Sequence, residues 1–290
     1  MSPPSTTTSI RLTRLRELWV HTGTACNLSC PFCHEGSKPG DGRIAAPTLA
    51  QLAPLLDEAA AHGVGRFAFT GGEPLILKGI LEILLHALRL RPVLVLTNGT
   101  APFIRRSHQL ALLRAAGHEL TFRVSIDFAD EARHDAARGL KNFRKALEGL
   151  RLLHVAGFPV GITRQRMQDE DAVAVEAQFR RLLRKQGLPE DLPIVPLPDL
   201  AAFGAVELPG PRTDAGTPGA PAIPPQCSSG RMLLIRDGAP RFHACPLTDD
   251  AERFDAGASL QEALAARVTP DHPRCKRCLD CGVDYAGAGL

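Results

Sequence analysis

The chain has 290 residues, of which 44% are hydrophobic and 22% charged, a balance typical of a globular protein that buries a core. Its formal net charge of +3 indicates neither a nucleic-acid partner nor a membrane surface. No stretch approaches the roughly 20 apolar residues that cross a bilayer, and residues 1–16 lack the apolar run of a signal peptide. We therefore expect a cytoplasmic protein that begins with a mobile tail over residues 1–16.

Residues 17–204 alternate short apolar or β-branched runs with longer helical patterns, which is typical of βα units around a parallel sheet. The runs predict strands at Glu17–His21, Arg66–Thr70, Val93–Thr97, Glu119–Asp127, Val160–Thr163 and near Ile194. The helical patterns predict a helix from the cap Thr48 to about Gly63, and others at 77–90, about 103–115, 141–156 and 172–186. About six units predict an α/β fold, a partial (βα)6 TIM-like barrel.

The composition changes after this region. Residues 205–226 are rich in Pro, Gly and Ala without periodicity, which predicts a linker or an active-site lid. Two short runs at 231–236 and 241–245 then flank Asp237-Gly238, a hairpin turn signal, and residues 259–267 predict a short helix. Because five of the eight cysteines lie here, residues 227–290 are expected to form a small cysteine-rich hairpin-plus-helix domain.

Three cysteines follow the first predicted strand with the spacing Cys26-x3-Cys30-x2-Cys33, and we call them the cysteine triad. The carboxyl ends of parallel strands form the active face of barrel-type proteins. Iron–sulfur clusters are normally held by four cysteines, so three thiolates indicate a catalytic [4Fe-4S] cluster with one exchangeable position. A zinc site or three unrelated thiols are the alternatives.

The triad loop resembles the CxxxCxxC signature of the radical S-adenosylmethionine (SAM) superfamily, and Phe32 matches the usual aromatic residue before the third cysteine. One βα unit later, Thr70-Gly71-Gly72-Glu73-Pro74 resembles that superfamily's GGEP motif. The resemblance implies that the open iron binds SAM, and that Glu73 accepts a hydrogen bond from the SAM ammonium group. It further implies that reduction cleaves SAM to methionine and a 5′-deoxyadenosyl radical, which abstracts hydrogen from a substrate.

Later strands carry further positions where superfamily members line the SAM or substrate pocket. His134-Asp135-x2-Arg138-Gly139 resembles an HD..RG stretch, so the resemblance implies that Arg138 pairs with the SAM carboxylate. A surface arginine and, for Asp127, a helix cap are the alternatives. The cofactor-binding residues implied by the resemblance are Phe32, Gly71, Gly72, Glu73, Pro74, Asn98, Ser125, Asp127, Arg138 and Ile162. No general base is identifiable.

The remaining cysteines form what we call the second cysteine group: Cys227, Cys245, Cys275, Cys278 and Cys281. Their density near the C-terminus indicates ligation. The arrangement resembles a twitch or shortened SPASM domain, which implies a second [4Fe-4S] cluster held by four of the five thiols. Structural zinc competes, because four-thiolate zinc sites use the same spacing. His243 or His272 could replace a ligand.

We thus expect a radical SAM oxidoreductase or maturase in which an auxiliary cluster assists electron transfer and a flavodoxin or ferredoxin supplies electrons. The chain ends at Ala286–Leu290 without the terminal Gly-Gly of the GTP-cyclising relatives, and no leader-binding domain precedes the barrel, so we expect a small-molecule or stand-alone peptide substrate. The alternative is an iron–sulfur electron carrier or a zinc-stabilised α/β binding protein without SAM chemistry. Neither nucleic acid nor membrane is an expected partner.

Overall fold

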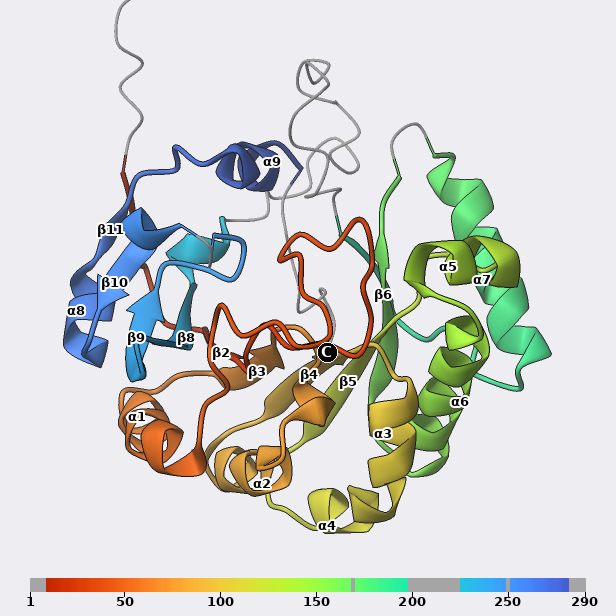
Figure 1. Ribbon diagram of the computed structural model, residues 1–290, viewed down its shortest axis with the longest axis horizontal. Coiled ribbons are helices and arrows are strands. Elements are labelled where there is room, and N and C mark those ends of the chain that lie inside the picture. Colours follow the sequence, from red (N-terminus) through yellow and green to blue (C-terminus); the bar gives the residue numbers. More distant parts are fainter. Residues whose placement is uncertain (1–8, 168–169, 198–224, 249–250, 282–290) are drawn as a thin grey trace, which may run out of the picture.

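The computed structural model in Figure 1 describes residues 9–167, 170–197, 225–248 and 251–281. Six strands pair in parallel, each with the next strand along the chain. They are β2 (Glu17–His21), β3 (Arg66–Thr70), β4 (Val93–Thr97), β5 (Leu120–Ser125), β6 (Val160–Gln165) and β7 (Ile194–Leu197). This curved sheet confirms the predicted partial barrel.

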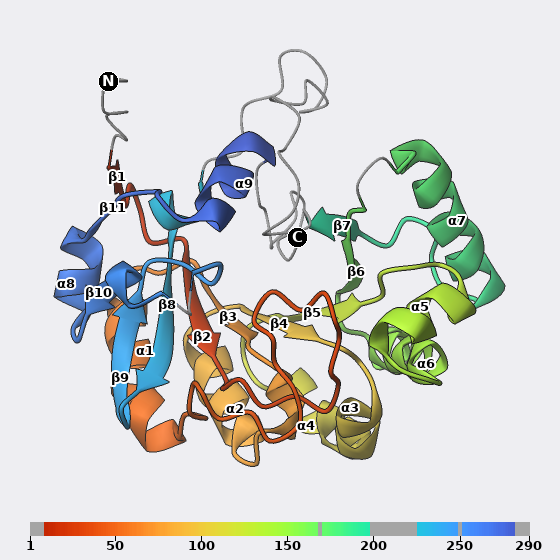
Figure 2. The ribbon, with the colours of Figure 1, turned by 45° about the horizontal axis from the view of Figure 1, so that its top comes forward.

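Helices connect these strands and lie along the outer side of the sheet (Figures 1 and 2). They are α1 (Leu49–Ala61), α2 (Ile80–Leu90), α3 (Ala101–Arg106), α4 (Leu110–Arg114), α5 (Glu131–Arg138), α6 (Asn142–Val155) and α7 (Ala172–Lys185). Thr48 caps α1 as predicted, and it forms a capping box with Gln51. None of the described helices is long and apolar enough to cross a membrane.

Two helical regions differ from the sequence prediction. The single helix expected over residues 103–115 is divided into α3 and α4 by a 3-10 turn at Ser107–Gln109. Helix α5 was not predicted, because it buries only His134 and Asp135 and therefore lacks an apolar stripe. Asp130 caps α5 by accepting a hydrogen bond from the Arg133 amide.

The C-terminal hairpin extends the barrel sheet. Strand β8 (Gly230–Arg236) pairs in parallel with β2, β9 (Ala239–His243) runs antiparallel to β8, and β10 (Asp255–Gly257) follows β9. Asp237 and Gly238, with φ of 51° and 77°, form the predicted turn. Helices α8 (Leu260–Ala265) and α9 (Pro273–Cys281) complete the described chain, and the sheet order is β10-β9-β8-β2-β3-β4-β5-β6-β7.

The prediction of a mobile tail over residues 1–16 is wrong for residues 9–16. Strand β1 (Ile10–Arg11) pairs with β11 (Arg267–Val268). The amide and hydroxyl of Thr13 both donate to the Ser228 carbonyl, and Leu15 is buried in the core. A two-residue strand is too short to give a readable period. Residues 1–8 lie outside the described residues, as does the expected linker or lid over 205–226 apart from Pro225 and Gln226.

The sheet separates two apolar clusters because neighbouring strand residues face opposite sides. Leu18 and Val20 of β2 belong to the larger cluster beneath the helices, whereas Trp19 between them faces the inner side. The inner cluster joins Trp19, Ala68 and Leu94 to the C-terminal segment through Cys227, Met232, Cys245, Cys275 and Cys278. The barrel and the cysteine-rich segment therefore share this inner core.

Candidate cofactor site

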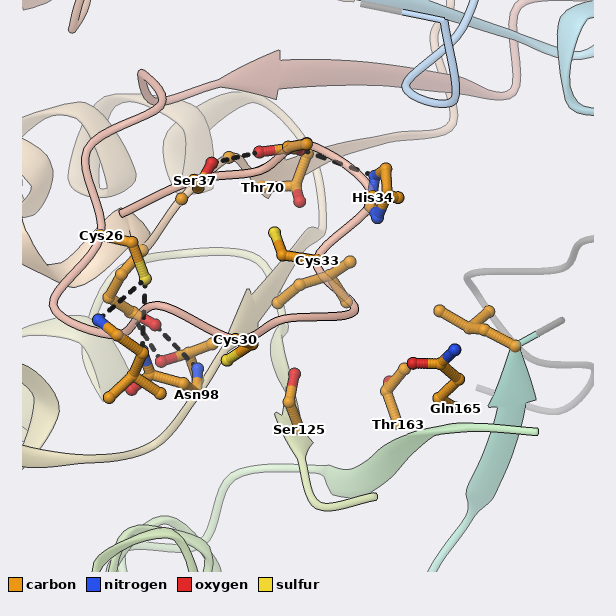
Figure 3. Close-up of a pocket in the computed structure, with 18 of the residues that line it drawn as sticks. Cys26, Cys30, Cys33, His34, Ser37, Thr70, Asn98, Ser125, Thr163 and Gln165 are labelled. Atoms are coloured by element: carbon orange, nitrogen blue, oxygen red, sulfur yellow. Dashed lines mark hydrogen bonds and ion pairs between the residues drawn. The ribbon is translucent and has the colours of Figure 1, made fainter. Parts of the chain in front are cut away.

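One pocket lies where the carboxyl ends of β2 to β6 meet. Most of the residues expected to bind a cofactor or cluster there line it: Cys26, Cys30, Phe32, Cys33, Gly71, Gly72, Glu73, Asn98, Ser125, Asp127 and Arg138. Figure 3 shows the triad on a single loop, with Ser125 and Thr163 on the strands opposite. Two expected residues are not among the lining residues. Pro74 is buried at the start of a 3-10 turn, and Ile162 faces the main core.

The three triad thiols are free and share this pocket. Burial, together with the charges of Glu73, Cys30 and Cys33, raises the pKa of Cys26 to about 12. Burial also raises the pKa of Cys30, which the positive charge of Arg138 opposes. The thiols of Cys26 and Cys30 therefore stay protonated until a metal binds and displaces their protons.

The two glycines of the GGEP stretch allow the triad loop to approach β3. A Cβ on Gly72 would lie 2.1 Å from the Ala25 carbonyl oxygen, and one on Gly71 would lie 2.7 Å from that of Gly23. The Gly72 amide donates to the Gly23 carbonyl, and the Glu73 amide donates to the Ala25 carbonyl. The glycines thus fix the backbone immediately before Cys26, which is a structural reason for the motif.

Glu73 is buried and joins the ends of β3 and β4. Its Oε1 accepts from the Thr97 hydroxyl at 2.7 Å and the Leu75 amide at 3.1 Å, and its Oε2 accepts from the Asn98 amide at 2.7 Å. Burial raises its pKa, while these hydrogen bonds act in the opposite direction. The carboxylate therefore has structural partners in addition to any cofactor.

Arg138 lies in the pocket wall with a side chain only 16% exposed, so it is not a surface arginine. It donates from Nε to Asp127, and its guanidinium lies 5.4 Å from the centre of the Phe32 ring. Asp127 also accepts from the Gln165 amide at 2.9 Å. Burial raises the pKa of Asp127, but the charge and hydrogen bond of Arg138 and the hydrogen bond from the Gln165 amide together lower it, and the net shift is downward. Asp127 therefore couples β5, β6 and α5, and Asp130 is the helix cap instead.

Sequence reasoning missed a buried carboxylate beside the triad, that of Glu35. Glu35 Oε2 lies 3.0 Å from the Ser37 hydroxyl and 3.5 Å from His21 Nε2, and Oε1 lies 3.8 Å from His34 Nε2. Burial opposes ionisation of Glu35, but these neighbours lower its pKa to about 2. The polar run Cys33-His34-Glu35 was the available signal. The other lining residues missed are Trp19, Leu28, Arg164, Gln165, Leu197 and Pro246.

Four thiols of the second cysteine group are buried together around Trp19 and Met232. Burial, followed by the charges of Cys278 and Cys275, raises the pKa of Cys227 to about 11. Burial raises that of Cys245 to about 12, and Cys227 and Cys275 add to the rise. The side chain of Cys281 lies outside the described residues.

The histidines of the C-terminal segment contact backbone groups. His243 faces the carbonyls of Ala251 and Cys245, at 3.1 and 3.4 Å, and His272 Nδ1 accepts from the Arg274 amide. Within the described part of the chain, no group of three or more His, Cys, Asp or Glu side chains is arranged to hold a metal ion. The four described thiols of the second group belong to one buried apolar cluster.

Comparisons with known proteins relate the chain to one superfamily. Residues 20–168 match the family described as the Radical SAM superfamily. The chain is 34% identical over 139 residues to the sporulation killing factor maturation protein SkfB of Bacillus subtilis, covering 47% of this chain and 32% of SkfB. It is 33% identical over 152 residues to a probable GTP 3′,8-cyclase of Methanocella arvoryzae, covering 52% of this chain and 46% of the cyclase. The chain thus spans less than half the length of either relative.

A solved structure shares the fold. Streptococcus suis SuiB bound to its precursor peptide SuiA superimposes with a TM-score of 0.62 at 14% identity. The superposition covers 94% of this chain and 70% of that chain. At this identity the likeness concerns the fold, including the region beyond the parallel strands.

Proposed function

The chain belongs to the radical SAM superfamily, and we propose that it uses a [4Fe-4S] cluster on Cys26, Cys30 and Cys33 to generate a 5′-deoxyadenosyl radical from SAM and abstract hydrogen from a substrate. The observation that carries this proposal is the meeting of the triad, Glu73, Ser125 and Arg138 in one pocket. An electron carrier without SAM chemistry would not need the last three residues.

The residues of this chain divide the task of holding the cofactor. The triad thiols would ligate the cluster, and Gly71 and Gly72 hold the loop that presents them. Arg138 donates to Asp127 through Nε, so its terminal Nη groups are the donors suited to a carboxylate such as that of SAM. Ser125 adds a hydroxyl on the opposite strand.

For the substrate, we propose a peptide. SkfB is a maturation protein and SuiB binds a precursor peptide, which supports this class. The cyclase relative makes a nucleoside triphosphate the competing candidate. Glu35 disfavours a nucleoside triphosphate, because a buried carboxylate in the pocket wall repels a polyphosphate. Part of the pocket wall is apolar and suits the side chains of a peptide; it is formed by Trp19, Leu197 and Pro246.

We further propose that the second cysteine group holds an auxiliary [4Fe-4S] cluster, with Cys227, Cys245, Cys275 and Cys278 as ligands. The burial of these four thiols in one cluster supports the assignment. Such a cluster would take up the electron that remains after hydrogen abstraction and loss of a proton, which is the oxidoreductase character of the proposal. Zinc in place of iron would remove this electron-transfer role.

The test is anaerobic reconstitution with iron and sulfide, reduction with dithionite, addition of SAM and assay of 5′-deoxyadenosine. The native chain should form this product and carry about eight irons, two clusters of four. Cys30→Ala should form none while retaining the irons of the second group. A protein that has intact clusters but yields no 5′-deoxyadenosine would contradict the proposal. Consumption of GTP in step with 5′-deoxyadenosine would replace the peptide by the nucleotide.

A further inference from the structure

One buried arginine connects both cysteine sites. Arg274, in the first turn of α9, is 9% exposed. Its Nη1 donates to the Leu247 carbonyl at 2.9 Å, and its Nη2 donates to the His34 carbonyl at 2.6 Å. One guanidinium therefore ties together three segments that are far apart in the sequence.

Each of the three segments carries cysteines. His34 follows Cys33 of the triad, Leu247 lies two residues after Cys245, and Arg274 directly precedes Cys275. Two of the segments also reach the triad pocket, because His34 and the neighbour of Leu247, Pro246, line it. Figure 2 shows α9 above the sheet, on the side opposite β6 and β7.

Trp19 provides a second connection between the sites. Its side chain lines the triad pocket and also packs in the inner apolar cluster that holds Cys227, Cys245, Cys275 and Cys278. Trp19 has no exposed surface, so any shift of the second cysteine group is transmitted to this wall of the pocket.

We propose that the second cysteine group is a structural determinant of the SAM pocket, and that Arg274 is the positioning residue through which it acts. Metal ligation at Cys245, Cys275 and Cys278 fixes α9 and the segment around Leu247. The rigid guanidinium then holds the His34 carbonyl and, with it, the loop that carries Cys33. This inference rests on the proposed function, because it concerns how tightly the triad site takes SAM.

The chemistry of the guanidinium explains why arginine is required. Its planar fork serves two carbonyls in fixed directions, whereas a lysine ammonium on a flexible stem presents a point charge. If Arg274 is replaced, two carbonyls in a mostly buried region lose a donor, and the segments of His34 and Leu247 become free to move apart.

The test compares Arg274→Gln, Arg274→Lys and Cys278→Ser with the matched control Arg253→Gln. The Arg253 side chain is 53% exposed, pairs with Asp271 and lies over the Phe254 ring. There are two readouts. SAM affinity is measured from the SAM-induced change in the electron paramagnetic resonance spectrum of the reduced triad cluster. Loop mobility is measured from amide hydrogen exchange of residues 30–38. Iron and zinc analysis records which sites are filled.

Arg274→Gln and Cys278→Ser should each bind SAM about tenfold more weakly and exchange faster over residues 30–38, while the triad irons remain. Arg274→Lys should fall between Gln and the native chain, and Arg253→Gln should match the native chain. If Arg274→Gln does not fold, Cys278→Ser decides. Native affinity and exchange in Cys278→Ser or Arg274→Gln would overturn the inference. By contrast, a native chain without any SAM-induced change would contradict the proposed function itself.

Discussion

At the scale of single residues, the pocket depends on the absence of a side chain at position 72. A Cβ there would overlap the Ala25 carbonyl oxygen at 2.1 Å, and backbone atoms cannot move aside as a flexible side chain can. Gly72→Ala should therefore destabilise the fold by about 2–3 kcal/mol and displace Cys26. Denaturant unfolding and the iron content of the triad site measure the two effects. Gly79→Ala is the control, because a Cβ there meets nothing within 4 Å; an equal loss in both variants would contradict this reading.

A second residue-scale effect concerns His134, which is fully buried on α5. Burial, together with the Arg138 charge, lowers its pKa from 6.5 to about 4. Neither ring nitrogen has a hydrogen-bond partner among the described residues. The neutral ring is therefore the form that the fold accommodates.

This shift makes folding stability depend on pH. Between pH 6.5 and 4 the unfolded chain binds a proton at His134 that the folded chain does not, so stability is full above 6.5 and falls as the pH drops. The loss is at most about 3 kcal/mol, from 1.36 kcal/mol per pKa unit. His134→Leu should lose less stability than the native chain between pH 7.5 and 4.5 in urea titrations. The exposed His118→Leu serves as reference, and parallel curves for all three proteins would refute the assignment.

At the scale of elements, the strands were predictable because their pattern is local. Arg66–Thr70 and Val93–Thr97 have the bounds predicted, since each is an apolar run between helix ends and turns. Helix α5 was not predictable, because its buried residues are His134 and Asp135 and its role is to carry Arg138 to the pocket. The two-residue strand β1 was not predicted for the same reason, because a long-range pairing defines it and not a local period.

The site residues also differ in whether a local sequence pattern indicates them. The triad and Gly71-Gly72-Glu73 are contiguous motifs, so the sequence alone indicated them. Glu35, Gln165 and Pro246 reach the pocket from three different segments, and only the fold brings them together. The four described thiols of the second group were found as a set, although their spacing could not separate them from Cys281.

Arg231 of strand β8 is fully buried and joins β8 to two neighbouring elements. The guanidinium donates to the carbonyls of Cys227, Gly230, Ala263 and Ala266, at 2.7–3.1 Å. Arg231→Gln leaves several buried carbonyls without a donor and should cost about 3 kcal/mol or more in the free energy of unfolding. Urea unfolding measures this cost. Arg267→Gln, on the exposed side of β11, should cost less than 0.5 kcal/mol, or roughly the range of ordinary surface changes.

At the scale of the whole molecule, residues 9–16 fasten the start of the barrel to the cysteine-rich segment. Thr13 bonds to the carbonyl of Ser228, the residue after Cys227, and the Arg16 amide donates to Ser229. The pairing of β1 with β11 adds a contact near the end of the described chain. The second cysteine group is thus held from both ends of the sequence, although all five of its members lie after residue 226.

Truncation separates this fastening from the barrel itself. Removing residues 1–14 deletes β1 and both Thr13 hydrogen bonds while it keeps Leu15 and β2, and should cost about 2–3 kcal/mol. For a chain of this size that corresponds to a fall in Tm of roughly 3–5 °C. Metal should leave the second cysteine group faster than the triad when a chelator is added, because the truncation frees the segment beside Cys227. A chain lacking only residues 1–8 is the reference. If the two truncated chains unfold at the same temperature and release metal at the same rate, residues 9–14 do not fasten the second group.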